Sequence, residues 1–362
     1  MKLRISRRDS ARKHGVSTLT FKLWDFTGTA LLNLFMLLFL VVYLSPLSFM
    51  VIAALTPSNQ FLDANAPILP SRRVTFNYEG KDRIVYQVPT EDGVKHWALY
   101  KPSRQSSEFI DPENPEAGLI HWEGQWRGLK AVYKFQPTLE NFTEFLGITK
   151  LPLLFRNTLL VALISEIGVL FSSIAVAYGF SRFRLPGGKY LFFLLIATIM
   201  IPSNITLVPT YFLFSGHMLN WIGTWLPLIV PHFFGSAILI FLLRQNFKSI
   251  PRDLDEAAML DGAGPLRILI SVILPQSIPV VTTVALLHFF YIWNETRYAS
   301  LYLGISPNLQ TISFGIQRSQ SFFFTPEALM VGALVVMVFP VVILFISQRF
   351  FMQDMIVTQI EK

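Results

Sequence analysis

The 362-residue sequence contains no cysteine and few charged residues. The absence of cysteine excludes disulfide bonds and thiolate chemistry. Charged residues make up only 15% of the chain, whereas hydrophobic residues make up 52%, and the mean hydropathy is +0.48. This balance is typical of a membrane protein.

Motifs for nucleotide chemistry are also missing. Gly187-Gly188-Lys189 has neither the first glycine nor the Ser/Thr of a Walker A loop, and Asp261–Gly264 lacks the third glycine of a dinucleotide-binding turn. The histidines are scattered, without metal-ligand spacing or a triad partner nearby in the sequence. We therefore expect no catalytic residue, no metal site, no cofactor and no ATP hydrolysis in this chain. The six histidines are His14, His96, His121, His217, His232 and His288.

Six apolar runs are long enough to cross a bilayer, since a span needs about 20 residues. They are approximately 26–55, 157–180, 190–213, 224–243, 268–293 and 328–347. The first run extends for about 30 residues without a charge, whereas the apolar core of a signal peptide has about 7–15. We therefore interpret it as an uncleaved span and predict an all-α membrane protein with six transmembrane helices.

Basic residues concentrate in alternate connections, which predicts the orientation. Residues 1–25 and the connections 181–189 and 244–267 are rich in Lys and Arg, whereas 214–223 contains neither. Both termini should therefore face the cytoplasm. The net charge of +7 follows from this topology and does not indicate nucleic-acid binding, which would require a clustered basic face.

The runs divide the chain into one span, a long gap and five further spans. Within the gap, apolar and polar residues alternate around Phe76, Tyr86 and Trp97, with turn formers at Glu79-Gly80 and Asp92-Gly93, so we expect a small antiparallel β meander. This insert either covers the outer mouth of a pathway or receives an extracytoplasmic partner, and the two roles are compatible. The expected divisions are a cytoplasmic segment 1–25, a first span 26–55, an extracytoplasmic insert 56–152, a five-helix core 153–348 and a cytoplasmic tail 349–362.

A short polar stretch between two apolar runs carries the most specific pattern. Residues 256–275 are EAAMLDGAGPLRILISVILP. Alanines favour a helix that another surface can approach closely, and glycine can adopt the left-handed conformation that ends it. A helix at about 251–262 would be too short to cross a bilayer but suits docking. The residues that carry the pattern are Glu256, Ala257, Ala258, Asp261, Gly262, Leu274 and Pro275.

This stretch resembles the EAA loop of permease subunits of ABC importers, with Val272 where the family has isoleucine. The segments 135–145 and 241–251, Met200-Ile201-Pro202 and Trp293-Asn294 are similar to carbohydrate-type permeases, in particular the six-span partner of the maltose-type pair. The resemblance implies the type I importer permease fold in a prokaryotic inner membrane. It also implies docking of the 251–262 helix on a dimer of ATPase subunits, which bind the ATP and Mg, together with a second permease subunit and an extracytoplasmic solute-binding protein.

Three polar residues in or near the expected spans are candidates for the substrate pathway. Glu166 is the only charged residue inside an expected span, and intramembrane acids tend to face a bundle interior or a pathway. Asn204 lies between two prolines that free backbone carbonyls, and Asn294 ends the fifth span. We expect His288 to be a packing residue whose polar groups are satisfied. A hydrogen-bonded structural role remains open for Glu166.

Alternative functions remain. The same loop occurs in ABC importers of amino acids, phosphate or metals, although the flanking motifs favour carbohydrate. A carrier or channel working alone would require paired intramembrane charges or an inverted repeat, which we do not find. An integral membrane enzyme would require a catalytic cluster, which is also missing from the sequence.

Overall fold

The computed structural model describes residues 18–61, 63–91, 93–320 and 325–360. Contacts divide the chain into two compact units, Met1–Leu139 and Glu140–Lys362. The helix α4 (Glu140–Ile148), which lies within the expected insert 56–152, belongs to the second unit. Of the expected cytoplasmic segment 1–25, residues 1–17 lie outside the described part of the chain.

The first unit begins with α2 (Thr18–Ala54), a single long helix. From Phe26 to Leu44 nearly every side chain is exposed, including large apolar ones on all sides. A helix that is apolar all round is stable only inside a lipid bilayer or a protein core. The stretch Phe26–Ala54 has the length and composition of a membrane span.

The rest of the first unit is built mainly from antiparallel strands. The main sheet has the order β2-β3-β4-β5-β6, and β7 pairs with β3 at Tyr86 and Gln87, on the side opposite β4. Glu79 (φ 54°) and Gly80 (φ 76°) form the two-residue turn between β2 and β3, where both positions need positive φ. Short elements flank the sheets: α3 (Ser58–Phe61), η1 (Pro115–Ala117) and η2 (Trp126–Gly128). The strands are β1 (Ser71–Arg73), β2 (Thr75–Tyr78), β3 (Lys81–Thr90), β4 (Gly93–Lys101), β5 (Ser106–Ile110), β6 (Ile120–Glu123), β7 (Lys130–Ala131) and β8 (Tyr133–Phe135).

Buried aromatic side chains hold this sheet together. Tyr86, Trp97 and Phe109 pack in one cluster, and the ring of Phe109 meets that of Trp122 edge to face, with centroids 5.9 Å apart. These residues come from four different strands, so the cluster ties the meander into one layer. The alternation seen in the sequence therefore corresponds to a sheet with buried aromatic residues on one side.

A polar cluster joins the second, two-stranded sheet of β1 and β8 to the preceding loop. The hydroxyl of Tyr133 donates to Asp63 Oδ2 at 2.7 Å, and Arg73 Nη2 forms an ion pair with the same oxygen at 3.1 Å. The hydrogen bond from Tyr133, followed by the Asn65 N–H and the Arg73 charge, lowers the pKa of Asp63 against the effect of burial. The charged carboxylate is therefore the favoured form here.

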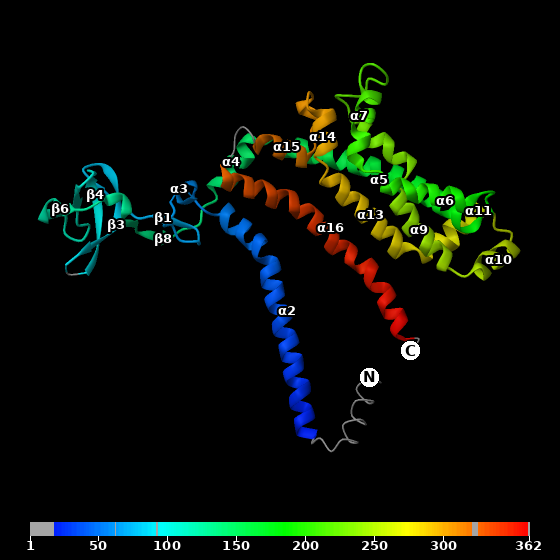
Figure 1. Ribbon diagram of the computed structural model, residues 1–362, viewed down its shortest axis with the longest axis horizontal. Coiled ribbons are helices and arrows are strands. Elements are labelled where there is room, and N and C mark those ends of the chain that lie inside the picture. Colours follow the sequence, from blue (N-terminus) through cyan, green and yellow to red (C-terminus); the bar gives the residue numbers. More distant parts are fainter. Residues whose placement is uncertain (1–17, 62, 92, 321–324, 361–362) are drawn as a thin grey trace. The chain divides into compact units, whose positions relative to one another are not determined.

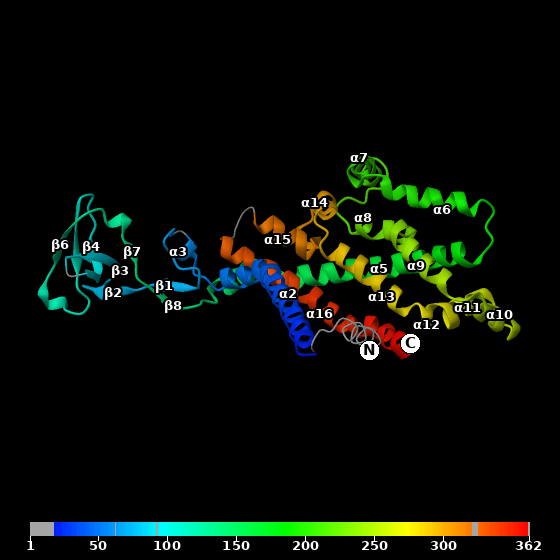
Figure 2. The ribbon, with the colours of Figure 1, turned by 60° about the horizontal axis from the view of Figure 1, so that its bottom comes forward.

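The second unit is helical, and α5 (Leu151–Arg182) runs through its middle. In both views α9 and α13 lie along α5, as their contacts require (Figure 1 and Figure 2). The short helices α10 and α11 lie at one end of the unit, and α14 and α15 lie at the other. Its remaining elements are α6 (Gly188–Ala197), η3 (Thr198–Met200), α7 (Ser203–Phe214), α8 (Leu226–Ile229), η4 (Val230–Phe234), α9 (Ala237–Ser249), α10 (Arg252–Leu260), α11 (Pro265–Ile268), η5 (Leu269–Ile273), α12 (Leu274–Gln276), α13 (Ile278–Trp293), α14 (Arg297–Leu303), η6 (Pro307–Leu309), α15 (Ile312–Gln320) and α16 (Pro326–Ile360).

The expected spans take two forms in the described residues. Four helical stretches are long and apolar enough to cross a membrane without a sharp bend. The third and fifth runs are instead bent pairs, with angles of 95° between Gly188–Met200 and Ser203–Phe214 and of 83° between Pro265–Gln276 and Ile278–Trp293. If each bent pair is one span, the number of spans is six.

Proline explains both bends. Pro202 holds Ile201 in an extended conformation (ψ 115°), so the helix before it cannot continue. Pro275 and Pro279 lie on either side of the second bend, at Ser277, and neither can donate a backbone hydrogen bond.

Candidate functional site

The helix α10 occupies the position of the expected docking helix and ends as its glycine predicts. It runs from Arg252 to Leu260, slightly shorter than the predicted 251–262. Gly262 has φ +81°, its N–H donates to Met259 at 3.0 Å, and the next N–H, of Ala263, donates to Ala258 at 2.9 Å. This pair of bonds is a Schellman motif, which satisfies the last carbonyls of a helix.

One side of α10 is fastened to α5 by a buried ion pair. Arg182 Nε lies 2.7 Å from Asp255 Oδ2, in an ion pair whose N–H is not aligned as a hydrogen bond, and the two side chains are 6% and 9% exposed. Arg182 Nη2 also donates to the carbonyl of Ile250 at 3.1 Å, just before α10. The Tyr178 hydroxyl donates to the carbonyl of Pro265 at 2.9 Å, just after it. Both ends of the α10 segment are therefore held by the last two turns of α5.

Asp253, Asp255 and Glu256 lie early in α10, where the positive end of the helix dipole favours carboxylates. Asp255 is buried, whereas Asp253 and Glu256 are exposed. Helical geometry turns the side chain of Asp255 toward α5, where the Arg182 guanidinium compensates its charge.

The rest of α10 is uncovered and exposes both apolar and charged side chains. Leu254, Met259 and Leu260 are 42%, 58% and 90% exposed. Ala257 is exposed and Ala258 partly so, and their small side chains let another surface approach the backbone. A helix that is held on one side and exposes large apolar side chains among charged ones is suited to binding a partner protein. Asp261 and Gly262 extend this exposed surface at the end of the helix.

Leu274 and Pro275 lie in α12 (Leu274–Gln276). They follow the π-helical turn η5, which packs Leu269 and Ile273 into the core of the second unit. Pro275 is exposed and Leu274 partly buried. Their position next to the bend at Ser277 makes them part of the connection between α10 and α13.

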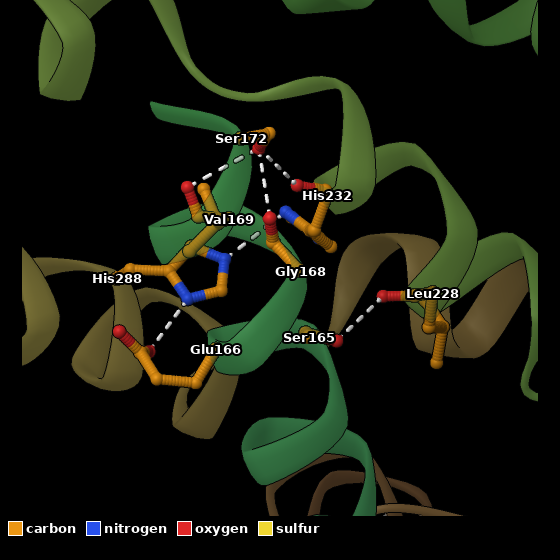
Figure 3. Close-up of polar contacts among 8 residues, drawn as sticks. All are labelled: Ser165, Glu166, Gly168, Val169, Ser172, Leu228, His232 and His288. Carbon is orange, nitrogen blue, oxygen red and sulfur yellow. Dashed lines mark hydrogen bonds and ion pairs between the residues drawn. The ribbon is translucent and has the colours of Figure 1, made fainter. Parts of the chain in front are cut away.

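Glu166 lies inside the helical unit in a chain of polar side chains (Figure 3). His288 Nδ1 lies 2.8 Å from Glu166 Oε2, and His288 Nε2 lies 3.0 Å from His232 Nδ1. The side chains of His288 and Glu166 are 4% and 14% exposed. His288 contacts Glu166 with one ring nitrogen and His232 with the other. The three side chains therefore form a line from α5 through α13 to η4.

The spacing of the histidines along the sequence gives no sign of these hydrogen bonds. His232 and His288 lie 56 positions apart, and each lies within an apolar run. His288 is buried and hydrogen-bonded on both sides, as a packing residue with satisfied polar groups would be. The general rule that ionisable residues in a membrane tend to pair could have linked both histidines to Glu166.

The backbones of α5 and η4 pack closely beside these three side chains. A Cβ on Gly168 would lie 2.5 Å from the ring of Phe233, so only glycine allows this approach of α5 and η4. Hydroxyl groups of α5 reach carbonyls across the same contact: Ser165 Oγ donates to Leu228 at 3.3 Å, and Ser172 Oγ to His232 at 3.4 Å (Figure 3). The polar chain therefore lies in a rigid environment.

The structure does not bring the other two pathway candidates to Glu166. Asn204 accepts a hydrogen bond from Arg297 Nη1 at 2.7 Å, and both residues are exposed. Asn294 Nδ2 donates to the carbonyl of Phe290 at 2.9 Å and closes the end of α13. Asn294 therefore has a local structural contact, whereas Asn204 links the starts of α7 and α14.

Comparisons with known proteins identify the family to which this chain belongs. Residues 148–357 match the family described as binding-protein-dependent transport system inner membrane component. The sn-glycerol-3-phosphate transport system permease protein UgpE of Rhizobium meliloti is 31% identical over 267 residues, which cover 73% of this chain and 90% of that protein. The sulfoquinovosyl glycerol transport system permease protein SmoH of Agrobacterium fabrum is 34% identical over 211 residues, 58% of this chain and 73% of that protein.

A solved structure shows the same fold at low sequence identity. A chain of a bacterial ABC transporter involved in the import of the acidic polysaccharide alginate aligns with a TM-score of 0.59 and 17% identity, covering 92% of this chain and 99% of the other. The matched family covers more than half of the sequence, including α10 and the hydrogen-bonded side chains of Glu166, His288 and His232, which we call the Glu166 chain. The protein therefore belongs to the family of inner membrane components of binding-protein-dependent transport systems.

Proposed function

We propose that this chain is the permease subunit of an ATP-driven ABC importer and forms half of the pathway for a sugar or sugar derivative. The observation that carries the proposal is α10, which is anchored to α5 by a buried ion pair and presents Leu254, Met259 and Leu260 outward. A partner that moves α10 would also move α5, because Arg182 and Tyr178 join them. We assign this partner role to a dimer of ATPase subunits, which would bind and hydrolyse the ATP.

The remaining parts of the proposal follow from family membership. A binding-protein-dependent system requires a solute-binding protein, and one permease chain supplies only part of a pathway, so a second permease subunit is expected beside it. We place α10 and both termini on the cytoplasmic side of the inner membrane, because the basic connections lie there. The expected insert 56–152 then lies outside.

The carbohydrate class rests on two observations. The segments around 241–251 and Met200-Ile201-Pro202 resemble carbohydrate-type permeases. The similar proteins SmoH and UgpE are named for sulfoquinovosyl glycerol and sn-glycerol 3-phosphate, which are a glycoside and a polyol phosphate. An importer of a phosphorylated polyol is therefore the second candidate.

The docking role can be tested with one charged substitution on α10. Leu260→Glu should prevent co-purification of the ATPase subunits from membranes, because it places a carboxylate in an apolar contact. Ile305→Glu is the matched control, since Ile305 is 77% exposed but follows α14, at the other end of the unit. Equal recovery of the ATPase with both variants would reject α10 as the docking helix.

A further inference from the structure

A cavity of about 280 Å³ lies at the end of the second unit away from α10. This volume is near the lower limit of about 300–1,000 Å³ for small-molecule sites, so it suits one sugar ring better than an oligosaccharide. Residues of α5, α7, α8, η4, α13 and α14 line it. The lining side chains that the argument uses are Thr210, His232, Tyr291, Glu295, Tyr298 and Tyr302.

Aromatic rings in fixed positions form part of this lining. Tyr298 and Tyr302 are stacked, with ring centroids 6.1 Å apart and planes at 15°. The hydroxyl of Tyr302 lies 3.3 Å from Thr210 Oγ1, which joins α14 to α7. Glu295 Oε1 accepts the backbone N–H of Tyr298 at 2.7 Å. Preorganised rings of this kind offer flat apolar surfaces at little entropic cost.

The Glu166 chain ends at the same cavity. His232 lines the cavity and uses its Nδ1 for the contact with His288 at 3.0 Å. Its Nε2 is therefore the ring nitrogen that can serve a ligand. Glu166 fixes the His288 ring from the other side at 2.8 Å, so the carboxylate orients His232 through one intervening imidazole.

The charge of the lining restricts the ligand. Glu295 is the only carboxylate among the lining residues, and they include no lysine and no arginine. The nearby Arg297 is not part of the lining and instead contacts Asn204 at 2.7 Å. A phosphate or sulfonate would therefore meet a negative group without a compensating cation.

We propose that this cavity is a binding subsite for one neutral sugar ring inside the permease subunit. The apolar face of the ring would lie against Tyr298 and its neighbours, and hydroxyl groups would bond to His232 Nε2 and to the Glu295 carboxylate. Glu166 and His288 act as positioning residues. The proposal rests on the proposed carbohydrate function and narrows it to uncharged substrates.

The test uses the assembled importer, with its ATPase, second permease and binding protein, in liposomes free of maltoside detergents. Initial uptake of radiolabelled maltose, trehalose and sn-glycerol 3-phosphate is measured for the wild type, and the transported sugar is then used for the variants. Tyr298→Leu and His232→Gln should each raise the apparent KM by about tenfold, the loss expected for one contact. ATP hydrolysis stimulated by the binding protein should persist in both, which shows that assembly survives.

Ser300→Ala is the control, because Ser300 is exposed on α14 and does not line the cavity. Tyr298 makes no contact in the Glu166 chain, so its variant tests the subsite even if His232→Gln fails to assemble. Sugar uptake with unchanged KM in Tyr298→Leu would overturn the subsite and leave the carbohydrate function intact. Uptake of sn-glycerol 3-phosphate alone would overturn the carbohydrate function and the neutral subsite together.

Discussion

A single hydrogen bond explains how Glu166 is accommodated inside an apolar unit. An acid near the middle of a membrane costs about 2.5–3.5 kcal/mol on insertion. A hydrogen bond to a charged group contributes about 1.5–3 kcal/mol, so the contact with His288 offsets most of this cost. The other carboxyl oxygen, Oε1, is buried without a partner, which makes the pairing through Oε2 more important.

Substitutions at Glu166 should therefore differ in stability. Glu166→Gln can still accept a hydrogen bond from His288, and we expect near-normal thermal stability and assembly. Glu166→Leu leaves His288 Nδ1 buried and unpaired, which should cost about 1–3 kcal/mol. Thermal unfolding of the purified subunit in lipid nanodiscs measures the difference. Ile167→Leu, on the exposed side of the same helix, is the control, and equal melting temperatures for the Leu and Gln variants would contradict the pairing.

At the scale of elements, the function proposed for α10 depends on how firmly it is joined to α5. The Arg182–Asp255 pair is buried, so loss of one partner leaves an uncompensated charge. Such losses cost about 3–5 kcal/mol, whereas replacement of both partners by apolar residues is often close to neutral. The pair therefore joins α10 to α5, and each charged side chain is stable in its buried position only when the other is present.

Arg182→Met and Asp255→Leu should thus be strongly non-additive. Each single variant should lower the thermal stability of the subunit markedly, and the double variant should recover most of it. The comparison is a double-mutant cycle on melting temperatures. Arg184→Met, an exposed basic neighbour, should have little effect. Additive losses would mean that the two charges do not interact in the folded protein.

The glycine that ends α10 allows a second test at this scale. A side chain at Gly262 would have open space within 4 Å, so any effect must come from its φ of +81°. Gly262→Val should strain the helix end, misplace α10 and reduce transport and substrate-stimulated ATP hydrolysis, while membrane insertion persists. Gly262→Asn should retain more activity, because asparagine tolerates this conformation.

Gly264→Ala serves as the control, since Gly264 has an ordinary φ of −76° and equally open surroundings. Normal transport by the Gly262→Val protein would argue strongly against a coupling role for α10. Equal loss in the Val and Asn variants would show that the side chain itself, and not the backbone conformation, disturbs the contact.

For the whole molecule, the orientation in the membrane decides which partner each surface can meet. The chain lacks cysteine, so single-cysteine variants can be labelled without a background. Lys95→Cys and Lys130→Cys, both at exposed positions of the insert, should react with a membrane-impermeant maleimide in intact cells. Lys189→Cys, exposed at the start of α6, should react only after permeabilisation. The opposite pattern would reverse the proposed topology.

The sequence by itself determined the features that depend on neighbouring residues. Hydropathy located the apolar helices, and the alternation around Tyr86 and Trp97 located strands of the β sheet. The pattern around Glu256 and Gly262 predicted a short helix and its end, because caps and propensities act over a few residues. The family resemblance rests on the same local motifs.

Only the tertiary structure decided which distant polar groups meet. Arg182 and Asp255 lie on different helices, as do Glu166 and His288, and periodicity within one element does not encode such pairs. The same holds for the bends at Pro202 and Ser277, since hydropathy alone does not distinguish a straight span from two helices at 95° or 83°. The cavity beside His232 likewise exists because six elements meet there, and the sequence of no single element indicates a cavity. Local conformational preferences determine where helices and strands form. Long-range packing and the cost of burying a charge determine which polar side chains pair with each other.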